Sequence, residues 1–100
     1  GMRLNDRLDW IVRYCTEVED RVDVLNRDFV RAYVNATGAE CVYQFYGADT
    51  CPQLGRDLSR CFKQKKLLRG RVGLPAMESG FPKWVYVYYT PPHKQIEAKA

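Results

Sequence analysis

The segment 51–74, CPQLGRDLSRCFKQKKLLRGRVGL, contains the signals that decide the fold of this 100-residue chain. In its first half three apolar side chains lie within about 80° of Leu54 on a helical wheel: Leu58, Cys61 and Phe62. Pro52 suits the first turn of a helix, where its missing N–H needs no partner. Thr50–Gln53 fits a capping box. The segment therefore predicts a helix over about 51–66 that leads into a strand, LLRGRVGL (67–74).

Two further helices are predicted before this segment. Between residues 4 and 22 the apolar positions project into one arc of roughly 120°, which is typical of an amphipathic helix. The stretch NRDFVRAYVNATG (26–38) indicates a second helix, with Asn26 as its N-cap and Gly38 as its left-handed C-terminal residue. Each helix has an apolar face that must be buried against another element.

Three segments are predicted to be strands, the first of them because it is rich in β-branched and aromatic residues. The first is ECVYQFY (40–46), which we expect to join the sheet rather than form a bare loop. LLRGRVGL and KWVYVYY (83–89) are the others, and PAMESGFP (75–82) joins them as an antiparallel hairpin. The predicted fold class is α+β, with three helices packed on a small antiparallel sheet.

The length of the chain predicts a single domain over residues 1–100. Its ordered core is expected over about 5–89, and residues 90–100 lack periodicity and are expected to form a tail. No apolar run approaches the roughly 20 residues of a membrane span. The first residues also lack the layout of a signal peptide. We therefore expect a cytoplasmic protein with no membrane partner.

The residue types that carry catalysis or bind metals are sparse. His93 is the one histidine, and the four cysteines contain no C-x-x-C pair. Zinc sites need closely paired ligands, so we expect buried free thiols, no metal and no cofactor. General acid–base or nucleophilic chemistry needs a base beside a nucleophile, and no such set is found. The sequence predicts that the protein is not an enzyme.

Positive charge is concentrated in the segment 51–74. It contains seven cationic side chains and one anion, Asp57, whereas the whole chain has a net charge of +4. On the predicted helix, the side opposite Leu54 has no carboxylate and no large apolar group, and we call it the outer face. Its members lie between roughly 140° and 280° on the wheel: Gln53, Arg56, Ser59, Arg60, Lys63 and Gln64. All can donate hydrogen bonds to phosphates or base edges, which favours a nucleic-acid partner over a merely solvated face.

Three helices, the last of them basic, followed by a hairpin resemble a winged helix-turn-helix domain over residues 5–89. The most telling stretch is LGRDLSRCFKQKKLLRGRVGL, and CPQLGRDL with GFPKWVYVY also resembles small phage proteins of this fold. The resemblance implies a C-terminal β-hairpin wing and places part of the outer face in the major groove of DNA: Arg56, Ser59, Arg60 and Lys63. It also implies phosphate contacts by the hairpin residues Arg69, Arg71 and Lys83.

Two features depart from this family. Its second and third helices are usually joined by a short turn, whereas here residues 39–50 intervene. The predicted wing tip contains Glu78 and no cation, which argues against a contact of the tip with DNA.

The predicted function is binding of double-stranded DNA, as a small regulator of transcription or replication. One alternative is a protein-interaction module that docks an acidic protein through its basic or aromatic surface. Another is RNA binding, with bases stacked on sheet aromatics: Tyr43, Phe45, Tyr86 and Tyr88. Trp10 and Tyr14 lie off the apolar arc of the first helix, and we expect them to be the contact of a homodimer.

Overall fold

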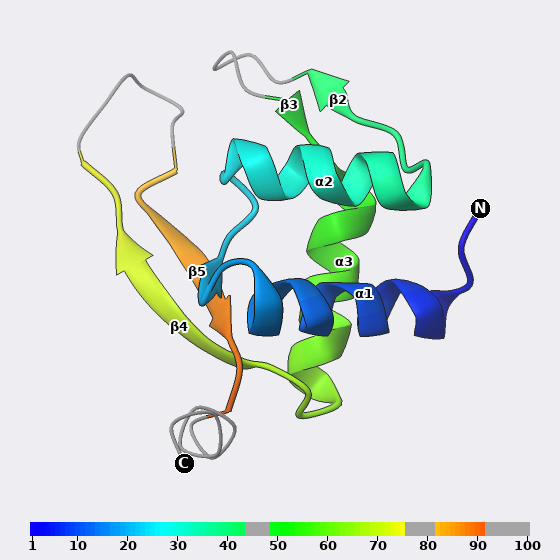
Figure 1. Ribbon diagram of the computed structural model, residues 1–100. Coiled ribbons are helices and arrows are strands. Elements are labelled where there is room, and N and C mark those ends of the chain that lie inside the picture. The colour runs from blue at the N-terminus through cyan, green and yellow to red at the C-terminus, as the bar shows by residue number, and fades with distance from the viewer. Residues whose placement is uncertain (44–48, 76–81, 92–100) are drawn as a thin grey trace.

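Three helices and five short strands make up the described residues 1–43, 49–75 and 82–91 of this computed structural model (Figure 1). In chain order they are α1 (Leu4–Glu17), β1 (Arg21–Val22), α2 (Arg27–Thr37), β2 (Val42–Tyr43), β3 (Asp49–Thr50), α3 (Pro52–Lys63), β4 (Leu68–Gly73) and β5 (Trp84–Tyr89). The predicted α+β class is confirmed. No helix within the described ranges is long and apolar enough to cross a membrane.

The hydrophobic core lies where the three helices meet. Each helix contributes three buried apolar residues from one face, as the predicted amphipathic patterns require: Leu8, Ile11 and Cys15 from α1, Phe29, Val30 and Tyr33 from α2, and Leu54, Leu58 and Cys61 from α3. Tyr88 of β5 and Val22 of β1 join the same core. The sheet is therefore attached to the helices through its β1–β5 edge.

The first helix is shorter than predicted. It ends at Glu17, and Val18, which the apolar pattern placed in the core, is 65% exposed. Val22 is buried, but from the strand β1 rather than from a helix. Glu19 and Asp20 explain the early end, because carboxylates are unfavourable at the negative C-terminal end of a helix dipole.

The second helix begins and ends as the sequence predicts. The side chain of Asn26 accepts a hydrogen bond from the Phe29 backbone N–H at 3.1 Å. Gly38 has a φ of 74°, the left-handed conformation that glycine adopts most readily. The Asn26 amide also donates to the Glu19 carboxylate at 3.0 and 3.1 Å, which ties the α1–β1 connection to the start of α2.

The main sheet has the strand order β1–β5–β4, and both pairings are antiparallel. The predicted hairpin of the two C-terminal strands is confirmed. The sequence predicts that residues 40–46 join this sheet rather than form a bare loop, and residues 44–46 lie outside the described ranges. Val42–Tyr43 does form a strand, but the expected sheet is wrong for it, because it pairs with Asp49–Thr50 in a separate two-stranded ladder. Figure 1 shows this ladder beside α2, away from the β4–β5 hairpin. The position of Val42–Tyr43 there, next to its sequence neighbour Asp49–Thr50, keeps it from reaching the main sheet.

The third helix is confirmed, but its predicted capping box is wrong. The N-cap is Cys51, which makes no side-chain capping bond. The Thr50 hydroxyl donates instead to the Val42 carbonyl at 3.0 Å, and the Gln53 amide donates to the Tyr33 hydroxyl at 3.0 Å. Both side chains form tertiary contacts rather than cap α3.

A buried carboxylate joins all three helices. Asp57 of α3 is fully buried and accepts hydrogen bonds from Arg7 Nε at 2.7 Å and Arg7 Nη2 at 3.3 Å. It also accepts from the Tyr33 hydroxyl at 2.6 Å and from Arg60 Nη1 at 2.9 Å. A buried charge is tolerated only when it is paired and fully hydrogen-bonded, and this one meets both conditions.

We expect the substitution Asp57→Asn to destabilise the fold strongly, because it leaves the Arg7 guanidinium without a counter-charge. Removing one partner of a buried pair costs about 3–5 kcal/mol, and the low end applies here because Arg7 retains some access to water. Urea unfolding followed by circular dichroism measures the loss. The matched control is Asp9→Asn: that carboxylate is 62% exposed and lies 3.7 Å from Lys66, so its removal should change the free energy of unfolding by less than about 1 kcal/mol. Equal stability of both variants would contradict the central role of Asp57.

Candidate nucleic-acid interface

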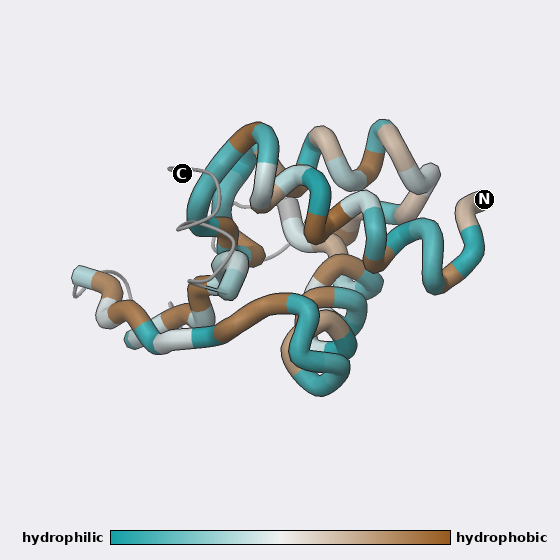
Figure 2. The backbone as a smooth tube through the Cα atoms, turned by 60° about the horizontal axis from the view of Figure 1, so that its bottom comes forward, coloured by the Kyte–Doolittle hydropathy of each residue, from teal (hydrophilic) through white to brown (hydrophobic). Residues whose placement is uncertain are grey.

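The single anion of the basic segment does not reach its surface. Asp57 lies on the inner side of α3, and an arginine from α1 compensates its charge. Hydrophilic residues cover the end of α3 and the turn to β4, as Figure 2 shows in teal. The outer face therefore presents no carboxylate to solvent, as the sequence predicts, and Arg60 is the one member of this face whose side chain reaches inward to Asp57.

Arg56 and Lys63 occupy the centre of the outer face. Both are exposed, and neither forms an ion pair with any other residue in the described ranges. Gln64, the C-cap of α3, is exposed beside them. These three side chains lie where the sequence predicts, with their donors directed to solvent.

Gln53 and Arg60 lie on the edge of the outer face that adjoins α1 and α2. Gln53 is bonded to Tyr33, and Arg60 is bonded to Asp57. The Arg60 side chain remains 42% exposed, and one of its five N–H donors makes the bond to Asp57. The domain thus holds this guanidinium in place while leaving donors available to a ligand.

Ser59 and Arg69 come together on the opposite edge of the outer face. They line a hollow of about 300 Å³ with Val24, Gly55, Tyr86 and Tyr88. The Arg69 guanidinium is sandwiched between the rings of Phe62 and Tyr86, 4.0 Å from each centroid. Such cation–π contacts fix the position of an arginine while its N–H edge can still donate.

Arg71 is stacked in the same way, 4.1 Å from the centroid of a Trp84 ring. The β4–β5 register places Arg69 opposite Tyr88, and Arg71 opposite Tyr86, so all of these side chains share one face of the hairpin. The sequence indicated Tyr86 and Tyr88 only as stacking surfaces in the RNA alternative, and the arginine contacts of Tyr86 and Trp84 were missed. A signal for these contacts exists in the sequence. It is the antiparallel alignment of R-x-R in β4 with W-x-Y-x-Y in β5.

The other predicted contact residues are placed differently. Lys83 is exposed where β5 begins, and its carbonyl accepts a hydrogen bond from the Leu74 N–H at 2.9 Å. Glu78 of the predicted wing tip, Phe45 of the RNA alternative and His93 lie outside the described residues.

Trp10 and Tyr14 pack within the domain. Their rings stack on each other with centroids 5.3 Å apart, and Trp10 contacts Phe29 and Tyr33 at 6.2 and 5.8 Å. Both are half-buried against the core. These contacts give the two rings a role in packing, and the homodimer stays a prediction.

Three buried groups of the helical core have raised pKa values. Burial raises the pKa of the Cys15 and Cys61 thiols to about 12, so both are neutral and unreactive at pH 7. Burial, and then the bond to Asp57, raises the pKa of Tyr33 to about 12. Within the described part of the chain, no three metal-ligating side chains cluster.

Comparison of the chain with protein-family models, curated proteins and solved structures finds no match.

The Asp57 network should make stability fall in acid. Burial alone would raise the pKa of this carboxyl group, but hydrogen bonds from Arg7 and Tyr33 outweigh it and hold the pKa below its ordinary value. The pKa of this carboxyl group is lower in the folded state than in the unfolded state, where it is about 3.9. The ionised carboxylate therefore stabilises the fold at pH values above the unfolded pKa, and this stabilisation is lost as the pH falls through the folded pKa. We expect melting temperatures of the parent to drop below about pH 4, and those of Asp57→Asn to drop less. Parallel pH profiles would show that Asp57 does not carry this dependence.

Proposed function

We propose that this chain binds double-stranded DNA, with the outer face of α3 in the major groove and the β4–β5 hairpin against flanking phosphates. In this proposal the protein is a winged-helix regulator of transcription or replication that acts in the cytoplasm without a cofactor. Its binding residues are those the sequence predicts, grouped by their position: Arg56, Lys63 and Gln64 at the centre, Gln53 and Arg60 on one edge, Ser59 on the other, and Arg69, Arg71 and Lys83 on the hairpin.

The single observation that carries the proposal is the separation of charge across α3. The one carboxylate between residues 51 and 74 is fully buried and neutralised from α1, while Arg56 and Lys63 face solvent. A surface that serves only solubility normally mixes both signs. A surface of one sign is the electrostatic footprint expected of a protein that binds a polyanion.

The order of elements is a second support. Three helices are followed by an antiparallel hairpin, and β1 adds a third strand to the sheet. The β2–β3 ladder between α2 and α3 departs from the short turn of the winged-helix family. The ladder ends at Thr50, just before α3 begins at Pro52. Arg56 and the later residues of α3 therefore follow the inserted ladder in the chain and are not part of it.

Arg56 and Lys63 are the residues with which to test the proposal. We expect Arg56→Ala and Lys63→Ala each to weaken binding of duplex DNA and to reduce the slope of log K against log salt by about one, because each removes one phosphate contact. Fluorescence anisotropy with a labelled random duplex at several salt concentrations measures both effects. Arg60 is a poor test residue, since its removal also disturbs Asp57.

The charge-matched control is Arg13→Ala on α1, whose neighbouring surface mixes both signs. It should leave the salt slope nearly unchanged. If Arg56→Ala and Lys63→Ala bind duplex DNA as tightly as the parent, the proposal fails and an acidic protein becomes the favoured partner of the basic surface.

A further inference from the structure

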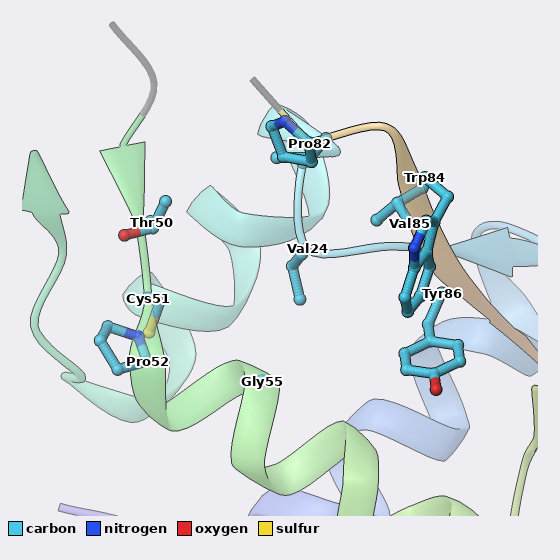
Figure 3. A pocket seen from close by; sticks show the side chains of 10 residues that line it. Val24, Thr50, Cys51, Pro52, Gly55, Pro82, Trp84, Val85 and Tyr86 are labelled. Carbon is cyan, nitrogen blue, oxygen red and sulfur yellow. The ribbon is translucent and has the colours of Figure 1, made fainter. Parts of the chain in front are cut away.

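A groove runs between α3 and β5, beside the outer face. Its larger part is a pocket of about 360 Å³ between the start of α3 and the aromatic end of β5 (Figure 3). The smaller hollow that contains Ser59 and Arg69 adjoins it, since Val24, Gly55 and Tyr86 line both. Ligand sites in proteins have volumes of roughly 300–1,000 Å³, so the pocket alone is large enough for a small flat group.

Gly55 is an unexplained residue on the floor of this groove. Glycine within a helix is less stable than alanine, and Gly55 does not have the positive φ that would require it. A Cβ atom at this position would meet no other atom within 4 Å. The packing of the domain therefore does not need a glycine here. Close approach of a ligand to the α3 backbone is one physical reason for a glycine at such a position.

The walls and the rim of the groove indicate the chemistry of that ligand. Pro52, Val24 and the rings of Trp84 and Tyr86 give it flat, apolar walls. Arg69 lines the smaller hollow, and its guanidinium stacks on Tyr86 at 4.0 Å. Arg71 lines neither hollow, but it stacks on Trp84, a wall of the larger one, at 4.1 Å. A ligand that matches both features has a flat ring and an anionic group close to it. Aromatic platforms bordered by cations are the usual means of binding single-stranded nucleic acid.

We propose that the α3–β5 groove binds unpaired nucleobases, whose phosphates contact Arg69 and Arg71. This site goes beyond the proposed duplex binding, because the unpaired base would lie in the groove rather than against the outer face. On an extended substrate, Arg69 and Arg71 would contact the phosphates of the unpaired strand rather than those that flank the duplex. A chain that uses both surfaces would favour duplex DNA with a single-stranded extension.

The test compares three labelled probes: a blunt duplex, the same duplex with a short oligothymidine extension, and the oligothymidine alone. The parent should bind the extended duplex about tenfold more tightly than the blunt one, as expected from stacking of a base on an aromatic ring. Gly55→Ala should abolish this preference because its methyl group projects into the groove. The same variant should melt about 4 °C higher than the parent, since alanine favours the helix, and this shows that the loss of binding does not come from unfolding.

Trp84→Ala should also abolish the preference. Val72→Ala is the matched control: Val72 is likewise an exposed apolar residue of the hairpin, but strand alternation places it on the face opposite Arg71. It should retain the preference for the extension.

The outcomes separate this inference from the proposed function. Binding of oligothymidine that Gly55→Ala removes supports the groove site even if the blunt duplex fails to bind. Binding of the blunt duplex without a preference for the extension overturns the groove site and leaves the proposed function intact. If Gly55→Ala melts higher and keeps the preference, or if only an acidic aromatic peptide binds the groove, the inference is wrong.

Discussion

The ion pair between Arg7 and the buried Asp57 is the constraint on which the rest of the structure depends. A carboxylate this deep in the core would be costly without a full set of partners, and its partners come from all three helices. The pair therefore fixes how α1 and α2 lie on α3. It also determines the surface, because it takes the one anion of the basic segment into the interior. Stability and surface charge thus depend on the same contact.

The elements set by local rules could be predicted from the sequence. Asn26 and Gly38 define the ends of α2 through backbone geometry within a few residues, and the hairpin follows from two apolar runs of matching length. The errors lie where distant residues compete with a local pattern. Val22 continues the apolar spacing of α1, but it lies in the strand β1, where it pairs with Tyr88. The strand at Val42–Tyr43 is locally correct, and only its pairing partner, which depends on the whole fold, could not be foreseen.

The candidate site shows the same division. The wheel identifies the outer face of α3, but it does not distinguish Arg56, which is exposed, from Arg60, which is bonded to Asp57. The Arg60–Asp57 bond joins residues three apart on α3, so the spacing alone could have shown it. The burial of Asp57 could not be foreseen, because it depends on Arg7 and Tyr33, which are 50 and 24 residues away in the chain. The stacked arginines of β4 likewise become visible only once the register with β5 is known. Sequence patterns give the face of an element, and the tertiary contacts decide which residues on that face are free.

These contacts divide the cations of the basic surface into two kinds. Arg60, Arg69 and Arg71 are held by a buried carboxylate or by aromatic rings, so much of their side-chain entropy is already lost before any ligand arrives. Arg56 and Lys63 have no such support among the described residues, so they lose this entropy on binding. Restrained guanidinium groups suit contacts that depend on geometry, such as a base edge or a fixed phosphate. Unrestrained cations suit the sequence-independent attraction to a polyanion, which salt weakens. On the proposed function, α3 would therefore combine a general electrostatic strip at its centre with more selective contacts along its two edges.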